Sequence, residues 1–139
     1  KEMMPYLKAH HMSFVPYFPL ASGLLTGKYD KNVTFADADI RSQIADFQEP
    51  RFSHALAAVD QIRPIAQAHD ATITQIFLAW YMQNPLISVV IPGAKHADQV
   101  VANAKSMTIG LSHTDYQTID DAFNWFKTTE SGKSLADPE

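Results

Sequence analysis

Two glycine-containing segments carry the residues of this sequence that are best suited to chemistry. The first spans residues 17–28 and contains Gly23 and Gly27, and the second spans residues 91–103 and contains Gly93. In each, an apolar run typical of a strand ends in proline and glycine. Glycine lets a backbone approach a phosphate closely, and the N–H groups at the start of a helix favour anions. The pattern therefore predicts that the two segments hold one dinucleotide between them.

The surrounding residues predict how these segments are positioned. Residues 13–19 and 87–91 are mostly apolar and include β-branched and aromatic side chains, which is typical of buried strands. Helical spacing and capping motifs predict helices over residues 1–11, 51–69 and 97–105 and behind two further caps. Strands that alternate with helices favour a parallel sheet with right-handed crossovers. The expected fold class is therefore α/β, although two strands alone seldom sustain a domain.

Local motifs set the expected ends of several helices. Thr72 with Gln75, and Ser112 with Asp115, have the spacing of a capping box. Pro64 is expected to kink or divide the helix over residues 51–69. Residues 20–50 have no sustained period, and a loop of that length is usually functional or disordered. Residues 129–139 are polar and are expected to form a frayed tail.

Composition excludes several classes of function. The chain has 139 residues, the size of one domain, and 46% of them are hydrophobic. A net charge of −4 without a basic stripe argues against nucleic acid as a partner. The absence of cysteine excludes disulfides, thiolate zinc sites and cysteine nucleophiles. No apolar run is long enough to span a bilayer. We expect a cytoplasmic protein with neither a nucleic-acid nor a membrane partner.

Three other groupings of chemistry-bearing residues favour structural interpretations. They are His10 with His11, Ser112 with His113 and Asp115, and Asp37 with Asp39. Adjacent histidines on a helix point in different directions, which argues against a metal site. The capping box explains the serine and aspartate of the second grouping better than a catalytic triad does. The two loop aspartates lack further ligands and are expected to be solvated, so no metal site is predicted.

The two segments also resemble a known family. The run 17–28, then Ala79 and Trp80 near a helix end, then the run 91–103, is similar to the last two β/α units of aldo/keto reductases. The resemblance implies a C-terminal fragment of a (β/α)8 TIM barrel, with the cofactor across the C-terminal ends of the strands. It implies that residues 1–128 form the cofactor-binding region and that residues 129–139 lie outside it as a polar tail.

The resemblance implies an NADP(H) site with these contacts: Tyr17, Pro19, Leu20, Ser22, Gly23, Lys28, Arg41, Gly93, Lys95, Gln99 and Asn103. The ring of Tyr17 would lie under the nicotinamide, and the backbone of residues 19–23 would face the pyrophosphate. Lys28 and Arg41 would close over that pyrophosphate. Residues 93 and 95 would receive the 2′-phosphate, and residues 99 and 103 the adenosine end. The lysine favours NADP over NAD because it offers a charge to the extra phosphate.

The sequence departs from the family pattern in two side chains and in extent. Phe18 stands where many members carry serine, and His96 stands where serine or asparagine is common, so His96 is expected to be a weaker N-cap. The family's catalytic Asp, Tyr, Lys and His come from the first half of the barrel, and none is assigned here. We expect the chain to begin just before the seventh strand and to be inactive alone.

These expectations are compatible with three hypotheses about function. The first is the NADP(H)-binding portion of an oxidoreductase that reduces small-molecule aldehydes or ketones. The second is a non-catalytic, cofactor-sensing barrel relative that regulates a partner. The third is a self-associating fragment. Unpaired outer edges of the two strands would favour a homo-oligomer of the isolated chain in each case.

Overall fold

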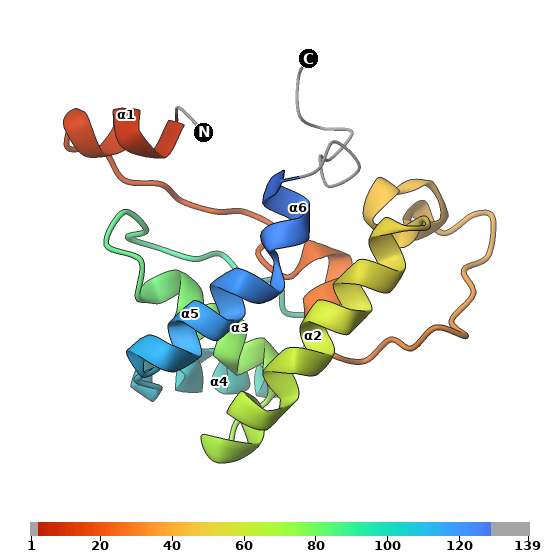
Figure 1. Ribbon diagram of the computed structural model, residues 1–139. Helices are drawn as coiled ribbons and strands as arrows, with labels where there is room; N and C mark the ends of the chain where they lie inside the picture. Colours follow the sequence, from red (N-terminus) through yellow and green to blue (C-terminus); the bar gives the residue numbers. More distant parts are fainter. Residues whose placement is uncertain (1–2, 129–139) are drawn as a thin grey trace.

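The computed structural model describes residues 3–128, and the predicted polar tail at residues 129–139 lies outside the described residues. Helices dominate the described part (Figure 1). The α-helices are α1 (Met3–Ala9), α2 (Arg51–Ala68), α3 (Ile73–Met82), α4 (Ala97–Lys105), α5 (His113–Ala122) and α6 (Asn124–Thr128). The 3₁₀ helices are η1 (Ala21–Thr26), η2 (Ile40–Gln43), η3 (Ala45–Phe47) and η4 (Ser106–Thr108).

The two predicted strand segments pair in parallel, but only through isolated bridges. Phe14 pairs with Ile87, and Tyr17 pairs with Ile91. The expected burial is wrong: Val15 is 44% exposed and Val89 is 53% exposed. The physical reason is that two strands without further neighbours leave their outer edges and much of their surface uncovered. The parallel arrangement that the alternation of elements predicts is nevertheless present.

Helix α2 is the longest helix, and it continues through its proline. Pro64 is expected to kink or divide this helix, and division is wrong, because one helix spans Arg51–Ala68 with that residue inside it. Proline removes one backbone donor from the helix. Val59 and Ile62 of the same helix are almost fully buried, at 1% and 0% exposure. Packing of this face therefore holds the helix together across the missing hydrogen bond.

Capping boxes begin α3 and α5 as the sequence predicts. The Thr72 hydroxyl accepts a hydrogen bond from the Gln75 N–H at 3.2 Å, and the Gln75 side chain accepts one from the Thr72 N–H at 2.9 Å. Ser112 and Asp115 make the same reciprocal pair at 3.1 Å each. Asp115 also lies 3.2 Å from Nε2 of His69, which joins the start of α5 to the end of α2. This cluster is a helix cap, as expected.

The main core lies where α2, α3 and α5 meet. Its buried members are Val59, Ile62, Ile65, Ala66, Ile73, Ile76, Phe77, Ala79, Leu111 and Ile119. Trp80 of α3 packs against this core. Figure 1 shows α5 and α3 lying alongside the middle of α2, with α1 set apart at the upper left. These three helices therefore form the packed centre of the described structure.

A second, aromatic cluster fastens the long loop to the beginning of α2. Its buried residues are Leu24, Phe47, Phe52 and Ala55, with Tyr29, Val33, Phe35, Ile44 and Phe126 packed against them. The rings of Tyr29, Phe35 and Phe47 meet edge to face, at centroid distances of 5.1 to 5.6 Å. Edge-to-face contacts are favourable arrangements for aromatic rings. The loop therefore has a core of its own. The sequence does not predict this core, because the loop residues follow no helical period.

Candidate functional site

The parallel pairing brings the starts of the two predicted segments together. The N–H of Ile91 donates to the carbonyl of Pro16 at 3.4 Å, next to the bridge between Ile91 and Tyr17. Further back, the N–H of Phe14 donates to the carbonyl of Leu86 at 2.7 Å. In a parallel pair both carboxyl ends lie at the same edge, which is where α/β folds bind ligands. Residues 17–28 and 91–103 thus leave the paired strands at one edge.

The first segment turns sharply through several left-handed residues. Phe18, Ala21, Ser22 and Gly23 have φ values of 54°, 47°, 55° and 91°. Non-glycine residues hold this conformation at a cost, so the surrounding structure must impose it. Two backbone hydrogen bonds do so: the N–H of Ala21 donates to the carbonyl of Phe18 at 3.0 Å, and that of Gly23 to Leu20 at 2.9 Å. The tight turn occurs where the sequence predicts a pyrophosphate contact.

Buried contacts hold this turn against the helices. Leu24 is 3% exposed in the aromatic cluster, and Pro19 is buried. Gly27 has a φ of 75°, and a Cβ added there would lie 2.5 Å from Cδ1 of Ile73 at the start of α3. That distance is too short for two carbon atoms, so any larger residue at this positive φ would force the end of the Ile73 side chain to move. Gly27 therefore lets η1 pack against α3, whereas Gly23 lies beside the side chains of Lys28 and Tyr29.

Lys28 and Arg41 gather around one tyrosine. Nη1 of Arg41 donates to the hydroxyl of Tyr29 at 2.5 Å, and that hydroxyl donates to the carbonyl of Ser22 at 3.4 Å. Nζ of Lys28 lies 4.8 Å from the centre of the same ring. A Cβ on Gly23 would lie 2.9 Å from this Nζ. The structure thus brings together four residues that the sequence assigns to the pyrophosphate.

Asp39 is an unexpected partner in this group. Its carboxylate accepts from Nε of Arg41 at 2.8 Å and also from Nη2 of the same residue, so the expectation of a solvated aspartate is wrong. Hydrogen bonds from the Arg41 side chain lower the pKa of Asp39 to about 2, and the same contact raises the pKa of Arg41. The physical reason is proximity: the aspartate lies two residues before the arginine and accepts its backbone N–H at 3.0 Å.

The second segment is open by comparison. A Cβ on Gly93 would meet nothing within 4 Å. Lys95 is exposed, and no residue of α4 is buried. The side chain of Gln99 accepts hydrogen bonds from the N–H groups of Lys95 at 2.6 Å and His96 at 3.2 Å. Gln99 therefore caps α4 from within, where His96 is expected to be a weak cap.

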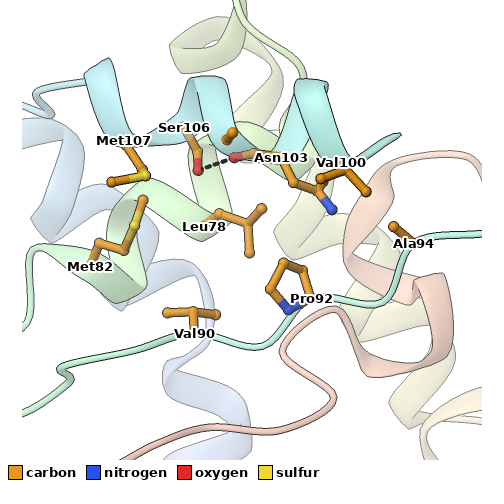
Figure 2. Close-up of a pocket in the computed structure, with 10 residues that line it drawn as sticks. Leu78, Met82, Val90, Pro92, Ala94, Val100, Asn103, Ser106 and Met107 are labelled. Carbon is orange, nitrogen blue, oxygen red and sulfur yellow. Dashed lines mark hydrogen bonds between the residues drawn. The ribbon is translucent and has the colours of Figure 1, made fainter. Parts of the chain in front are cut away.

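A buried glutamine places α4 against α3. Nε2 of Gln75, which is 8% exposed, donates to the carbonyl of Ala102 at 2.8 Å. The next residue, Asn103, is partly buried, and Figure 2 shows its side chain on the side of α4 that faces Pro92 and Ala94. Asn103 follows Gln99 by four positions, which places both on one face of the helix. Tyr17 lies at the other predicted end of the site and is 79% exposed.

An apolar cavity of about 320 Å³ lies between α3, α4 and the second strand segment (Figure 2). Its lining includes Leu78, Met82, Val90, Pro92, Val100 and Met107, with Asn103 as one of its polar members. These side chains offer little to an anion, so the cavity itself is poorly suited to a phosphate. The described residues contain no group of three or more His, Asp or Glu side chains that could hold a metal ion. None of the helices within residues 3–128 has the length and apolar character needed to cross a bilayer.

A sequence profile of the Aldo/keto reductase family matches residues 1–124 of the chain. The chain belongs to the aldo/keto reductase family. Among similar proteins, a putative voltage-gated potassium channel subunit beta of Schizosaccharomyces pombe is 33% identical over 110 residues, which are 77% of this chain and 32% of that protein. The aldo-keto reductase str7 of Strobilurus tenacellus is 32% identical over 108 residues, covering 78% of this chain and 32% of that protein. The aldo-keto reductase yakc [NADP(+)] of S. pombe is 29% identical over 120 residues, or 86% and 35% of the two chains.

A solved aldo/keto reductase has the same architecture. The glycerol dehydrogenase of Gluconobacter oxydans superimposes with a TM-score of 0.76 at 25% identity, over 97% of this chain and 38% of that chain. The expected fold class, part of a (β/α)8 barrel, is therefore confirmed. The chain spans about a third of the length of the curated relatives named above.

Proposed function

We propose that this chain is the NADP(H)-binding portion of an aldo/keto reductase, and that the full-length protein reduces small-molecule aldehydes or ketones with NADPH. The observation that carries the proposal is the parallel pairing at Tyr17 and Ile91, since it sends both glycine-containing segments from one edge. Family membership and the NADP(+) in the name of one relative support the choice of cofactor. We propose a cytoplasmic location for the protein, and a sequence without cysteine is compatible with such a reducing compartment.

The pyrophosphate contacts belong to the turn after the first strand. The backbone at Pro19 and Leu20, the Ser22 hydroxyl and the close approach permitted by Gly23 would surround it. Lys28 and Arg41 supply positive charge next to this turn. Cations with fixed positions stabilise phosphates through charge-assisted hydrogen bonds. Within residues 3–128, Arg41 uses three of its five N–H groups on Asp39 and Tyr29, which leaves two for a phosphate.

Other residues of the two segments would bind the adenosine and nicotinamide ends. Lys95 lies beside the open backbone at Gly93 and would bind the 2′-phosphate. Gln99 and Asn103 share one face of α4 and would bind the adenosine. The exposed ring of Tyr17 would lie under the nicotinamide. NADPH supplies the hydride to a carbonyl carbon; we assign no residue of the described chain the role of proton donor, and the reaction is proposed for the full-length protein.

The test is cofactor discrimination by the full-length protein. Dissociation constants for NADPH and NADH are measured by calorimetry for the native protein and for Lys95→Ala. A charged hydrogen bond contributes about 1.5–3 kcal/mol, so the variant should bind NADPH roughly 10- to 150-fold more weakly. Its NADH affinity should stay the same. Lys105→Ala, at the C-terminal end of the helix that follows Lys95, is the matched control and should alter neither constant.

An equal loss of affinity for NADPH and NADH in Lys95→Ala would contradict the assignment of that lysine to the 2′-phosphate. Absence of NADPH binding by the native full-length protein would reject the proposed function itself.

A second candidate is a cofactor-sensing regulatory subunit. It is favoured by the relative from S. pombe and by a second one, from Arabidopsis thaliana, 31% identical over 112 residues, whose names describe voltage-gated potassium channel beta subunits. Such a protein would bind NADPH and affect a partner without significant turnover of its own. The two candidates are separated by steady-state reduction of a panel of aldehydes and ketones by the full-length protein. Turnover favours the reductase, and tight NADPH binding without turnover favours the regulator.

The isolated 139-residue chain is proposed to self-associate. Val15, Val89 and Ile91 expose apolar surface along the two strand segments, at 44%, 53% and 56% exposure. Contiguous apolar surface of this kind drives association. Light scattering of the chain in dilute solution should give the mass of a dimer or a larger assembly. A folded monomer would contradict the proposal.

A further inference from the structure

Tyr29 is the point at which the residues of the proposed pyrophosphate site converge. Its hydroxyl lies 2.5 Å from Nη1 of Arg41 and 3.4 Å from the carbonyl oxygen of Ser22. The Nζ of Lys28 lies 4.8 Å from the centre of its ring. A Cβ on Gly23 would lie 3.4 Å from the same hydroxyl. The sequence assigns a role to each of these neighbours and none to the tyrosine between them.

The hydroxyl connects two parts of the loop that lie far apart in sequence. A tyrosine hydroxyl can accept one hydrogen bond and donate another. Here it accepts from Arg41, which follows it by 12 residues, and donates to Ser22, which precedes it by 7 residues. It therefore fixes the distance between the guanidinium and the left-handed turn that would face the phosphates.

The ring is itself held in place by the aromatic cluster. Phe35 and Phe47 both meet it edge to face, with centroids 5.6 Å away. Phe47 is 8% exposed and forms part of the cluster packed on α2. The guanidinium of Arg41 also lies over the ring of Phe35, with Cζ 4.6 Å from its centre. A side chain fixed by packing can orient polar neighbours more precisely than a mobile one.

We propose that Tyr29 is a positioning residue for the pyrophosphate of NADP(H), acting by holding Arg41 and the Ser22–Gly23 turn in binding geometry. The inference rests on the proposed function. Groups that are already ordered in the free protein lose less entropy when a ligand binds, which strengthens binding. Because the pyrophosphate is common to NADPH and NADH, the contribution of Tyr29 should be the same for both cofactors. This distinguishes it from Lys95, which would affect only NADPH.

The test compares two hydroxyl deletions in the full-length protein. Tyr29→Phe keeps the ring contacts and removes both hydrogen bonds, and the dissociation constants for NADPH and NADH should both rise roughly 3- to 10-fold. Tyr116→Phe is the matched control, because this partly buried tyrosine lies on α5, away from the loop. It should leave both constants unchanged. The KM for NADPH should rise in Tyr29→Phe whereas kcat at saturating NADPH stays within about 2-fold.

A double-mutant cycle with Arg41→Met tests whether the effect passes through the arginine. In the Arg41→Met background, Tyr29→Phe should change the dissociation constant by clearly less than it does in the native background, because only the hydrogen bond to the Ser22 turn is then lost. Unchanged binding in Tyr29→Phe, or a full effect that persists without Arg41, would overturn the inference. A Tyr29→Phe protein that fails to fold would assign the residue to stability and equally reject it. If the native protein binds no NADPH, the proposed function fails first and this inference fails with it.

Discussion

The loop that carries Lys28 and Arg41 is tied to the helices by buried side chains, whereas the segment from Gly93 to Asn103 has no buried residue. The loop has an aromatic cluster, a glycine pressed against α3 and a set of hydrogen bonds around Tyr29. The α4 segment is held mainly by its packing on α3 and by the hydrogen bond from Gln75. Two similar glycine-containing segments are thus held against the helices by different contacts. Substitutions in them should therefore change the stability of the protein by different amounts.

Removing a buried anchor of the loop should have the largest effect. Leu24 is 3% exposed, and Leu24→Ala should lower the free energy of unfolding by about 2–5 kcal/mol, because it leaves a cavity in the aromatic cluster. The matched change in the other segment is Val101→Ala, at a residue that is 60% exposed, which should cost less than about 0.5 kcal/mol. Denaturant titration of both variants measures the difference. Similar costs at the two positions would contradict the contrast between the segments.

Two glycines give a smaller contrast of the same kind. Gly27→Ala adds a Cβ at a positive φ and presses it against Ile73, so it should cost about 1–3 kcal/mol of unfolding free energy. Gly93→Ala adds a Cβ to open space and should change stability by less than about 0.5 kcal/mol. Thermal melts of the two variants measure the difference in stability. A destabilised Gly93→Ala protein would show that the second segment is packed more tightly than described.

Some of this contrast can be predicted from sequence and some cannot. The capping boxes at Thr72 and Ser112 follow from short local patterns, as does helix 97–105. The parallel pairing follows from the alternation of elements. The aromatic cluster does not, because Tyr29, Phe35 and Phe47 follow no helical or strand period and meet only through a folded loop. The pairing of Asp39 with Arg41 has a local signal in their spacing of two residues, which compositional reasoning overlooks.

The smallest expected effect is a loss of stability at low pH through the contact between Asp39 and Arg41. The folded-state pKa of Asp39 is about 2, below the ordinary value of about 3.9, because Arg41 donates to its carboxylate. A depressed pKa means that the contact contributes to stability above about pH 4 and that this contribution is lost as the pH falls toward about 2. The carboxyl carbon resonance of Asp39 should therefore titrate with a midpoint near 2. Asp39→Asn should remove this part of the pH dependence, and a midpoint near the ordinary value would contradict the contact.

The most direct test of the central claim is hydrogen exchange of the full-length protein with and without NADPH. One dinucleotide held between the two segments should slow exchange in residues 17–41 and in residues 91–103 at the same NADPH concentration. Because the second segment is the more open in the free protein, it should gain the larger protection. The amides of α5, which lie outside the proposed site, should be unchanged. Protection of only one segment, or protection spread evenly over all helices, would contradict a shared cofactor site.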